Sequence, residues 1–217
     1  MASLPADQRL LMILSNLIYT KTVVVPRLFG FFTSHGYPYS KDMQTSVLAE
    51  LDDLEKKIFE EYMQHKSQKL IECIQNGASV GGFNWTTCPK PTGVRTYVRE
   101  VIFDLVIVHA EVYSVSAGLV KKVLEQLVGV VATQMLKLVK SVKKFSLNGV
   151  FHFYVEVMVL QTKLNSFLAD QSKKDFQQAL KTLGSIPYDE KLEDLISDFE
   201  KCTELLTRCF GVARPKV

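Results

Sequence analysis

Cysteine is scarce in this sequence: the chain of 217 residues has four, and none of them lies in a CxxC motif. A disulfide framework and a cysteine-rich zinc site are therefore not expected. The protein is instead expected in a reducing compartment. No uncharged run reaches the roughly 18 residues that a membrane-spanning helix needs, so no span is predicted. The apolar residues 10–14 are followed by no clear cleavage site, which argues against a signal peptide.

Recognisable chemical motifs are also missing. The sequence contains no phosphate-binding loop, no HExxH, no GxSxG and no nucleotide-binding fingerprint. Basic and acidic residues nearly balance, at 26 and 23, so charge gives no general attraction to nucleic acid. These absences predict a protein that is not an enzyme, that has no cofactor, no metal site and no catalytic residue, and that binds no nucleic acid.

Apolar residues at helical spacing are abundant. Hydrophobic residues make up 47% of the chain and charged residues 23%, which is typical of a folded domain with a sizeable core. The segment 98–113, VREVIFDLVIVHAEVY, belongs to an apolar seam whose members recur in steps of four and three. The seam comprises Val94, Val98, Val101, Leu105, Val108, Val112, Val115 and Leu119. Arg99 and Asp104 would be costly in lipid, so the segment is predicted to be the central helix of a bundle.

Two histidines lie near carboxylates and could suggest a site. His109 is five residues from Asp104 and two from Glu111, and neither spacing places two side chains on one helical face. His152 and Glu156 are one helical turn apart, but two ligands do not make a metal site. A structural histidine and an ordinary side-chain pair are the favoured interpretations.

Two helices are expected in the first third of the chain. Pro26 is expected to kink or break the first, because proline lacks an N–H and crowds the preceding turn. Gly36 marks the end of that segment. A long amphipathic helix follows, with Ser40 as its N-cap, and it is expected to stop at Asn76-Gly77.

The longest irregular segment, residues 77–92, contains an adjacent glycine pair and two prolines. It is the expected boundary between a helical pair from a preceding bundle, residues 1–82, and a C-terminal helical bundle, residues 93–217, with the linker reaching to about residue 92. Trp85 is expected to anchor this linker to a helix rather than to bind a ligand.

The helix predicted after Gly118 carries lysine on its polar side. Its seam is expected to comprise Val120, Leu124, Leu127, Val131, Met135, Leu138, Val142 and Phe145. Four lysines near its end form the candidate site of the chain: Lys137, Lys140, Lys143 and Lys144. One interpretation is a face for an anionic membrane or a partner protein. The other is a solvated helix end, where lysine is favoured by the helix dipole.

The segment 149–161, GVFHFYVEVMVLQ, is rich in β-branched and aromatic residues, which favour a strand. A lone strand among helices would leave its backbone groups unpaired, so a helix is predicted. Ser172 is expected to cap a short helix that Gly184 closes. A last helix is expected from about Asp189. Its inward residues are expected to be Leu192, Leu195, Phe199, Cys202, Leu206 and Cys209.

Four stretches occur together in this order: LSNLIYTKTVVVPRLF (14–29), FNWTTCPKPTGVRTYVREV (83–101), VHAEVYSVS (108–116) and KKFSLNG (143–149). They resemble the exocyst complex component 2 family, whose members are subunits of the exocyst tether. The similarity runs from about Gln8 to Phe210 and covers only the C-terminal part of a much longer subunit.

The resemblance implies an all-α fold, an elongated rod of consecutive antiparallel helical bundles. It also implies a structural role in exocytosis: helical packing against other exocyst subunits, in the cytoplasm and peripherally at the plasma membrane and secretory vesicles. The family's GTPase-binding immunoglobulin-like domain has no counterpart here, so a Ral-type GTPase is not an expected partner. Peripheral contact of the four lysines with an anionic membrane is the alternative function.

Overall fold

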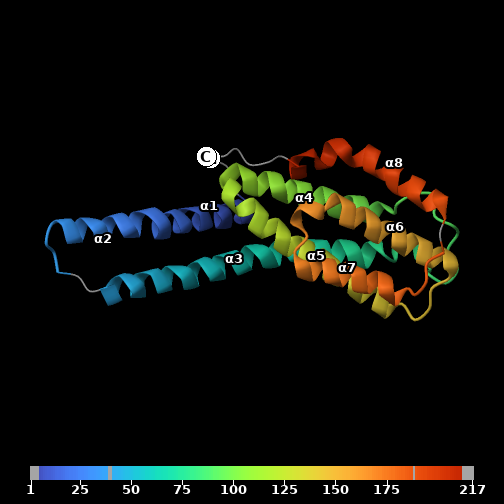
Figure 1. The fold of residues 1–217 in the computed structure, drawn as a ribbon, viewed down its shortest axis with the longest axis horizontal. Helices are drawn as coiled ribbons and strands as arrows, with labels where there is room; N and C mark the ends of the chain where they lie inside the picture. The colour runs from blue at the N-terminus through green and yellow to red at the C-terminus, as the bar shows by residue number, and fades with distance from the viewer. Residues whose placement is uncertain (1–4, 39–40, 188, 212–217) are drawn as a thin grey trace. The chain divides into compact units, whose positions relative to one another are not determined.

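The computed structural model describes residues 5–38, 41–187 and 189–211, and every regular element within these ranges is helical (Figure 1). The main helices are α1 Ala6–Tyr19, α2 Val25–Ser34, α3 Lys41–Gly77, α4 Thr96–Val115, α5 Val120–Ser141, α6 Leu147–Lys163, α7 Asp170–Thr182 and α8 Glu190–Thr207. The all-α prediction is thus confirmed, whereas the expected cap at Ser40 lies outside the described residues. Contacts divide the chain into unit 1, Met1–His65 with Glu111–Gly118, and unit 2, Lys66–Ala110 with Leu119–Val217.

Unit 1 contains a helical hairpin in which α1 and α2 run beside the first part of α3 (Figure 1). Near the start of α1, Asp7 lies 3.1 Å from His65. Further along, the ammonium of Lys21 binds Asp52 at 2.6 Å and also pairs with Glu55. Residue 7 pairs with residue 65, whereas residue 21 pairs with residues 52 and 55. Residue numbers thus rise on the first arm and fall on α3, so the two arms are antiparallel. Figure 1 shows the same arrangement.

The arms of this hairpin bury one apolar face each. The buried residues are Leu11, Leu14, Leu17, Val25 and Phe29 on the first arm and Phe59, Tyr62 and Met63 on α3. Within each helix they lie three or four residues apart, which places them on one side. This burial supplies the hydrophobic free energy that holds the hairpin closed.

Of the kink or break predicted at Pro26, the structure excludes the break. A five-residue π-helical turn, Thr20–Val24, directly precedes it, and helical backbone angles continue through Val24 and Val25 into α2. Proline cannot donate a hydrogen bond to the preceding turn, and its ring crowds that turn. The wider π turn absorbs both effects, and π turns of this kind occur inside longer helices. The helix then ends at Ser34, where Gly36 takes a positive φ of 70°.

For the same arm, the absence of a membrane span stays a prediction. The helical stretch Ala6–Ser34 is long and apolar enough to cross a membrane by length and composition. In the 18-residue window that meets these criteria, only 22% of the residues are buried. The apolar character of this arm therefore lies largely on its surface.

Unit 2 is a bundle in which α5 packs beside α7 and α6 beside α8 (Figure 1). Its largest fully buried side chains are Leu70, Ile74, Ile102, Leu105, Leu124, Leu127, Met135, Phe153 and Phe176. The predicted seam of α4 is buried at Val98, Val101 and Leu105, but Phe103 and Ile107 are 49% and 43% exposed. The predicted seam is therefore buried, but α4 keeps one exposed face, which a helix at the centre of a bundle would not have.

The β-rich segment 149–161 is helical, as predicted, and forms most of α6. Nine residues of this segment are buried, the first being Gly149 and the last Leu160. Burial on several sides outweighs the local strand preference, because tertiary packing supplies most helical stability in proteins. Ser146 caps the helix, its hydroxyl accepting from the Gly149 N–H at 3.1 Å.

Two details near the C-terminal end differ from prediction. Helix α7 begins at Asp170, so Ser172 lies inside the helix, 2% exposed, rather than at its cap. On α8, Cys202 is exposed and Thr203 is buried instead, at 3%. Thr203 follows the buried Phe199 by four residues, a full helical turn, which places it on the inner face.

The irregular segment belongs wholly to unit 2, so the contacts group the residues differently from the division expected between 1–82 and 93–217. Trp85 is 8% exposed, which confirms its predicted anchoring role. That 1–82 and 93–217 are separate domains stays a prediction.

Gly149 offers a test of how tightly this segment is held. A Cβ at this position would collide with the carbonyl oxygen of Trp85. We expect Gly149→Ala to lower the free energy of unfolding by about 1–3 kcal/mol, as overpacked cores do. Gly30→Ala is the control, because no atom lies within 4 Å of its Cβ. That change is expected to stabilise α2 by about 0.5–1 kcal/mol. Urea unfolding followed by circular dichroism measures both, and equal effects would contradict the close approach.

Candidate functional site

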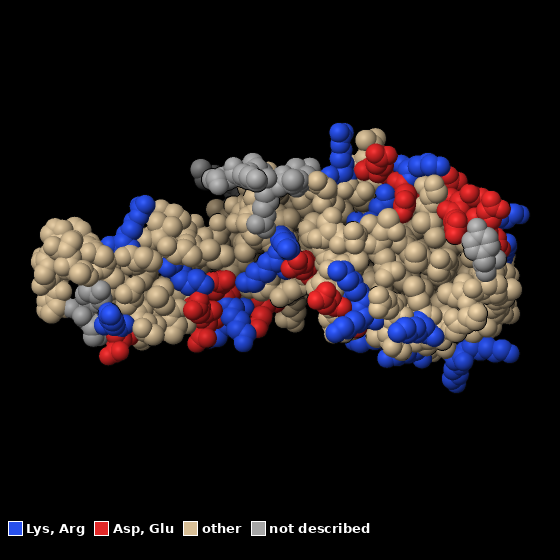
Figure 2. All heavy atoms as spheres, in the orientation of Figure 1, with Lys and Arg blue, Asp and Glu red and all other residues tan. Residues whose placement is uncertain are grey.

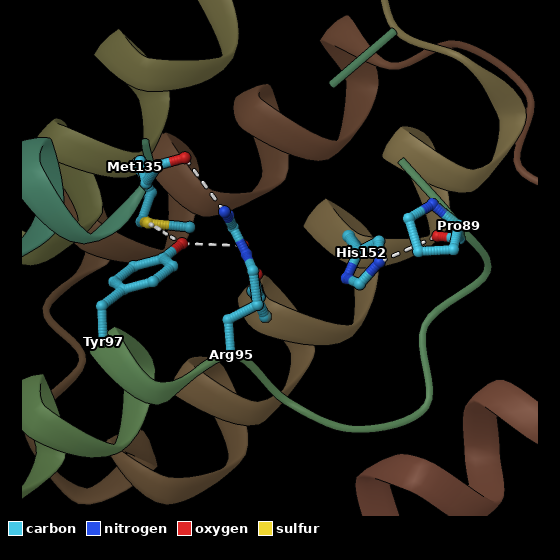
Figure 3. Close-up of polar contacts among 7 residues, drawn as sticks. Pro89, Arg95, Tyr97, Met135 and His152 are labelled. Atoms are coloured by element: carbon cyan, nitrogen blue, oxygen red, sulfur yellow. Dashed lines mark hydrogen bonds and ion pairs between the residues drawn. The ribbon is translucent and has the colours of Figure 1, made fainter. Parts of the chain in front are cut away.

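A buried ion pair lies inside unit 2. Arg95, just before α4, donates through Nε to Glu156 Oε1 at 2.5 Å and through Nη2 to Oε2 at 3.0 Å. Its third nitrogen donates to the carbonyl oxygen of Ala78 at 3.0 Å. The hydroxyl of Tyr97, which lies beside the Arg95 side chain in Figure 3, donates to Glu156 Oε2 at 2.7 Å. The Glu156 side chain is only 1% exposed, so these groups replace its water shell completely.

Aromatic rings enclose the same guanidinium. Its central carbon lies 4.0 Å from the ring centroid of Phe83, 4.4 Å from Trp85 and 4.9 Å from Tyr97. Arginine stacks on aromatic faces through its planar, delocalised charge. Trp85 also meets Phe153 of α6 edge-on, with 6.0 Å between centroids. These rings and the carboxylate surround Arg95 and make it a packing centre.

The ionisation of this cluster is fixed by its surroundings. Burial raises the pKa of Tyr97 well above its ordinary value, and the charge of Glu156 acts in the same direction. Burial lowers the pKa of Arg95, but the hydrogen bond and charge of Glu156, together with Tyr97, act the other way, so the pKa is raised overall. At neutral pH the tyrosine stays protonated and the arginine charged. The cluster is therefore suited to holding structure and not to transferring protons.

Two further side chains of α6 bind backbone carbonyls of the irregular segment. Asn148 Nδ2 donates to Cys88 O at 3.1 Å. His152 Nε2 donates to Pro89 O at 3.1 Å (Figure 3). His152 and Glu156 were expected to form an ordinary side-chain pair. Instead each binds the segment that precedes α4. Among the described residues no group of three or more His, Cys, Asp or Glu side chains could hold a metal ion.

His109 lies away from this cluster. Burial lowers its pKa, and its ring centroid is 5.9 Å from that of Phe210. Asp104, the carboxylate considered as its partner, binds Lys69 at 2.6 Å. These contacts fit the structural role that was predicted for His109.

The structure brings three of the four candidate lysines together. Lys140, Lys143 and Lys144 line a hollow of ≈ 460 Å³ in unit 2, whereas Lys137 is exposed on α5 outside that lining. The other lining residues are Val139, Val142, Phe145, Val150, Thr182 and Leu183. A role for the lysines as a membrane or partner face stays a prediction.

A second candidate surface was not foreseen. Six large apolar residues on the first arm of unit 1 are each 43% to 56% exposed. We call them the apolar stripe: Met12, Ile13, Tyr19, Val24, Leu28 and Phe31. Met12, Tyr19, Val24, Leu28 and Phe31 advance by about one or two turns at a time, and the π turn takes up the five-residue step between Tyr19 and Val24. These five residues follow the face opposite the buried one, and Ile13 lies at the edge of that face, about 100° around the helix from Met12. Figure 2 shows few charged side chains over the α1–α2 end of this unit.

A match to a family of known proteins covers most of the chain. The family model described as "Exocyst complex component Sec5" matches residues 2–210. The chain belongs to the Sec5 family of exocyst components. The resemblance drawn from the four sequence stretches is thereby confirmed.

Named Sec5-family relatives agree with this assignment. The chain is 32% identical to mouse exocyst complex component 2 over 99% of this chain and 24% of the relative. It is 32% identical to the human protein of that name, over 97% of this chain and 23% of the relative, and 27% identical to the Drosophila protein, over 99% and 24%. The chain therefore spans about a quarter of the length of these relatives. No solved structure matches the chain.

Sequence reasoning found the Sec5 stretch 83–101 but missed what it does in space. That stretch holds Arg95, the cation of the buried ion pair, and Trp85 and Tyr97, whose rings lie against its guanidinium. One signal for the pair was present. Glu156 is the single charged residue in the apolar segment 149–161, and a carboxylate buried there requires a cation from elsewhere.

Removing one charge of the pair tests its contribution. Glu156→Gln keeps the side-chain shape but leaves Arg95 buried without a counter-charge, which is expected to lower the free energy of unfolding by about 3–5 kcal/mol. The double change Arg95→Met/Glu156→Leu is expected to lose less, because no charge is left stranded. Urea unfolding followed by the fluorescence of the chain's single tryptophan measures both.

Asp198→Asn is the matched control, because it removes an exposed ion pair with Lys201. Exposed pairs contribute about 0–1 kcal/mol. If Glu156→Gln were no more damaging than Asp198→Asn, the buried pair would not be a main source of stability.

His152 predicts a pH dependence. Burial lowers its pKa, helped by the charge of Arg95, although Glu156 and the bond to Pro89 act the other way. Its folded pKa therefore lies below the unfolded value of about 6.5. The neutral form's contribution is complete above that value and is lost as pH falls toward the folded pKa. We expect wild-type stability to fall as the pH is lowered below the unfolded value of about 6.5.

His152→Gln should fall less over the same range, because glutamine does not titrate and can still donate to Pro89. Urea midpoints at several pH values measure the difference, with His109→Gln as a second variant. Parallel pH profiles of wild type and His152→Gln would show that His152 is not the titrating group.

Proposed function

We propose that this chain is a non-enzymatic structural part of the exocyst. It acts in the cytoplasm, peripherally at the plasma membrane and secretory vesicles, in the tethering that precedes membrane fusion. Its partners are other exocyst subunits, and it binds them by packing helix against helix. Membership of the Sec5 family supports this function.

The apolar stripe is the observation that carries the proposal. Exposed large apolar residues concentrate on unit 1, with Tyr37, Met43, Leu54 and Tyr113 exposed in addition to the stripe. Large apolar residues exposed together on one part of a protein are typical of an interaction site. Its residues recur at the helical spacing by which one helix fits the groove of another. An apolar helix of a neighbouring subunit is the partner that this geometry fits.

Insertion of unit 1 into a bilayer is a poorer fit. The stripe's helix is paired with α3, and the facing part of α3 is densely charged. The charged residues are Glu50, Asp52, Asp53, Glu55, Lys56, Lys57, Glu60 and Glu61. Carrying them into lipid would cost several kcal/mol each. A protein partner covers the stripe without moving these charges from water.

Capture of subunits by the tagged chain tests the proposal. The wild type, incubated with the other exocyst subunits purified separately, is expected to retain at least one. Ile13→Glu/Leu28→Glu places two charges in the apolar stripe, and we expect it to reduce capture by a factor of about ten or more. Ser46→Glu/Ala49→Glu adds the same charge to exposed positions of α3 and is expected to capture as well as wild type.

Circular dichroism establishes that each variant is folded, and sedimentation shows whether it is monomeric. A folded wild-type monomer that retains no subunit would contradict the proposal. Equal capture by the stripe variant and the α3 control would contradict the role of the stripe.

A further inference from the structure

The hollow beside Lys140 is built from four separate pieces of unit 2. The end of α5 contributes Lys140, the α5–α6 connection contributes Lys143 and Lys144, the first turn of α6 contributes Val150, and the end of α7 contributes Leu183. In Figure 2 the region where Figure 1 places the α5–α6 connection shows blue side chains on a tan surface. The volume of ≈ 460 Å³ is in the range of small-molecule sites, about 300–1,000 Å³.

The charge of this hollow is all of one sign. Three of its lining residues are lysines and none is Asp or Glu. No ion pair or side-chain hydrogen bond among the described residues involves any of these three lysines. The hydroxyl of Thr182, which also lines the hollow, donates its hydrogen bond to the carbonyl oxygen of Gln178 at 2.8 Å. The lysines are therefore the donors that remain for a ligand. Uncompensated positive charge in a concave site raises the local concentration of anions.

The helix dipole accounts for only part of this arrangement. Lys140 lies in the last turn of α5, where a cation stabilises the helix. Lys143 and Lys144 follow Val142, whose extended backbone ends that helix. The dipole's effect falls off within the last turn, so it gives no reason for two more lysines beyond it. A ligand gives one reason for all three.

We propose that this hollow binds a small polyphosphorylated group, such as an inositol phosphate, either free or as the headgroup of a lipid. One phosphate monoester carries about −1.5 to −2 charges at neutral pH, so two or more phosphates match three ammonium groups. Lysine binds phosphate as a point charge with three donors. The first turn of α6 at the wall adds the positive end of a helix dipole. The apolar part of the lining accommodates the carbon ring to which the phosphates are attached.

Binding of two probes to the 217-residue chain tests this site. The first probe is soluble inositol trisphosphate, measured by calorimetry. The second is phosphatidylcholine vesicles with and without phosphatidylinositol bisphosphate, measured by flotation. Saturable binding of the soluble probe identifies a site for the free group. Binding only to vesicles that contain the bisphosphate identifies a site for the lipid headgroup.

Three variants separate a site in the hollow from a diffuse attraction. Lys140→Glu/Lys143→Glu/Lys144→Glu is expected to weaken binding by about 100-fold, at roughly one tenfold step or slightly less for each lysine. Lys41→Glu/Lys56→Glu/Lys57→Glu makes the same change of net charge on exposed α3 positions of unit 1 and is expected to weaken it by no more than about threefold. Val142→Trp fills the hollow without changing charge and is expected to weaken binding by about tenfold or more.

The proposal fails if wild type binds neither probe. It also fails if the two triple variants lose binding equally, or if Val142→Trp binds as well as wild type, because either result describes general attraction to a basic surface. Capture of exocyst subunits, measured in parallel, is expected to be unchanged in the hollow variants, so failure here is distinguishable from failure of the apolar stripe.

Discussion

Arg95 carries its charge inside unit 2, and the surrounding structure is arranged to keep that charge stable away from water. A buried guanidinium without partners would cost many kcal/mol. Its donors instead meet Glu156 of α6 and the carbonyl of Ala78 just beyond α3, while Phe83 and Trp85 cover its faces. One side chain thereby connects the end of α3, the irregular segment, the start of α4 and the middle of α6. Displacing any of these segments would leave a buried charge without its partner, so the ion pair fixes their positions relative to one another.

Much of the fold could be predicted because helical periodicity is a local property of the sequence. The buried stripes of α3, α4 and α5 follow steps of three and four, and Gly36 and Gly184 end helices where positive φ angles are needed. Helix α6 was predictable for a different reason. Its residues favour a strand, but a lone strand among helices would leave its backbone unpaired, and that cost outweighs local preference.

The remainder depended on contacts that no local pattern contains. The π turn before Pro26 lets a helix continue where the proline rule predicts a break. The inward position of Thr203 rather than Cys202 follows from where α8 packs, which shifts the buried stripe by one residue. The partner of Glu156 lies 61 residues away, and the lysine hollow combines residues from the ends of α5 and α7. Sequence spacing can point to the residues of the ion pair and of the hollow. It does not show that the fold brings them into contact.

The distance along the chain between Arg95 and Glu156 also orders events during synthesis. A ribosome adds about 5–20 residues per second, so a separation of 61 residues means that the guanidinium exists for roughly 3–12 s before its carboxylate is made. Through that interval Phe83 and Trp85 have no complete α6 to pack against, although α3 is already made and α4 is completed before Glu156. Unit 2 therefore cannot close from its N-terminal end as it emerges. Its assembly waits for α6, and the nascent chain holds an unpaired cation and two aromatic rings in water until that helix arrives.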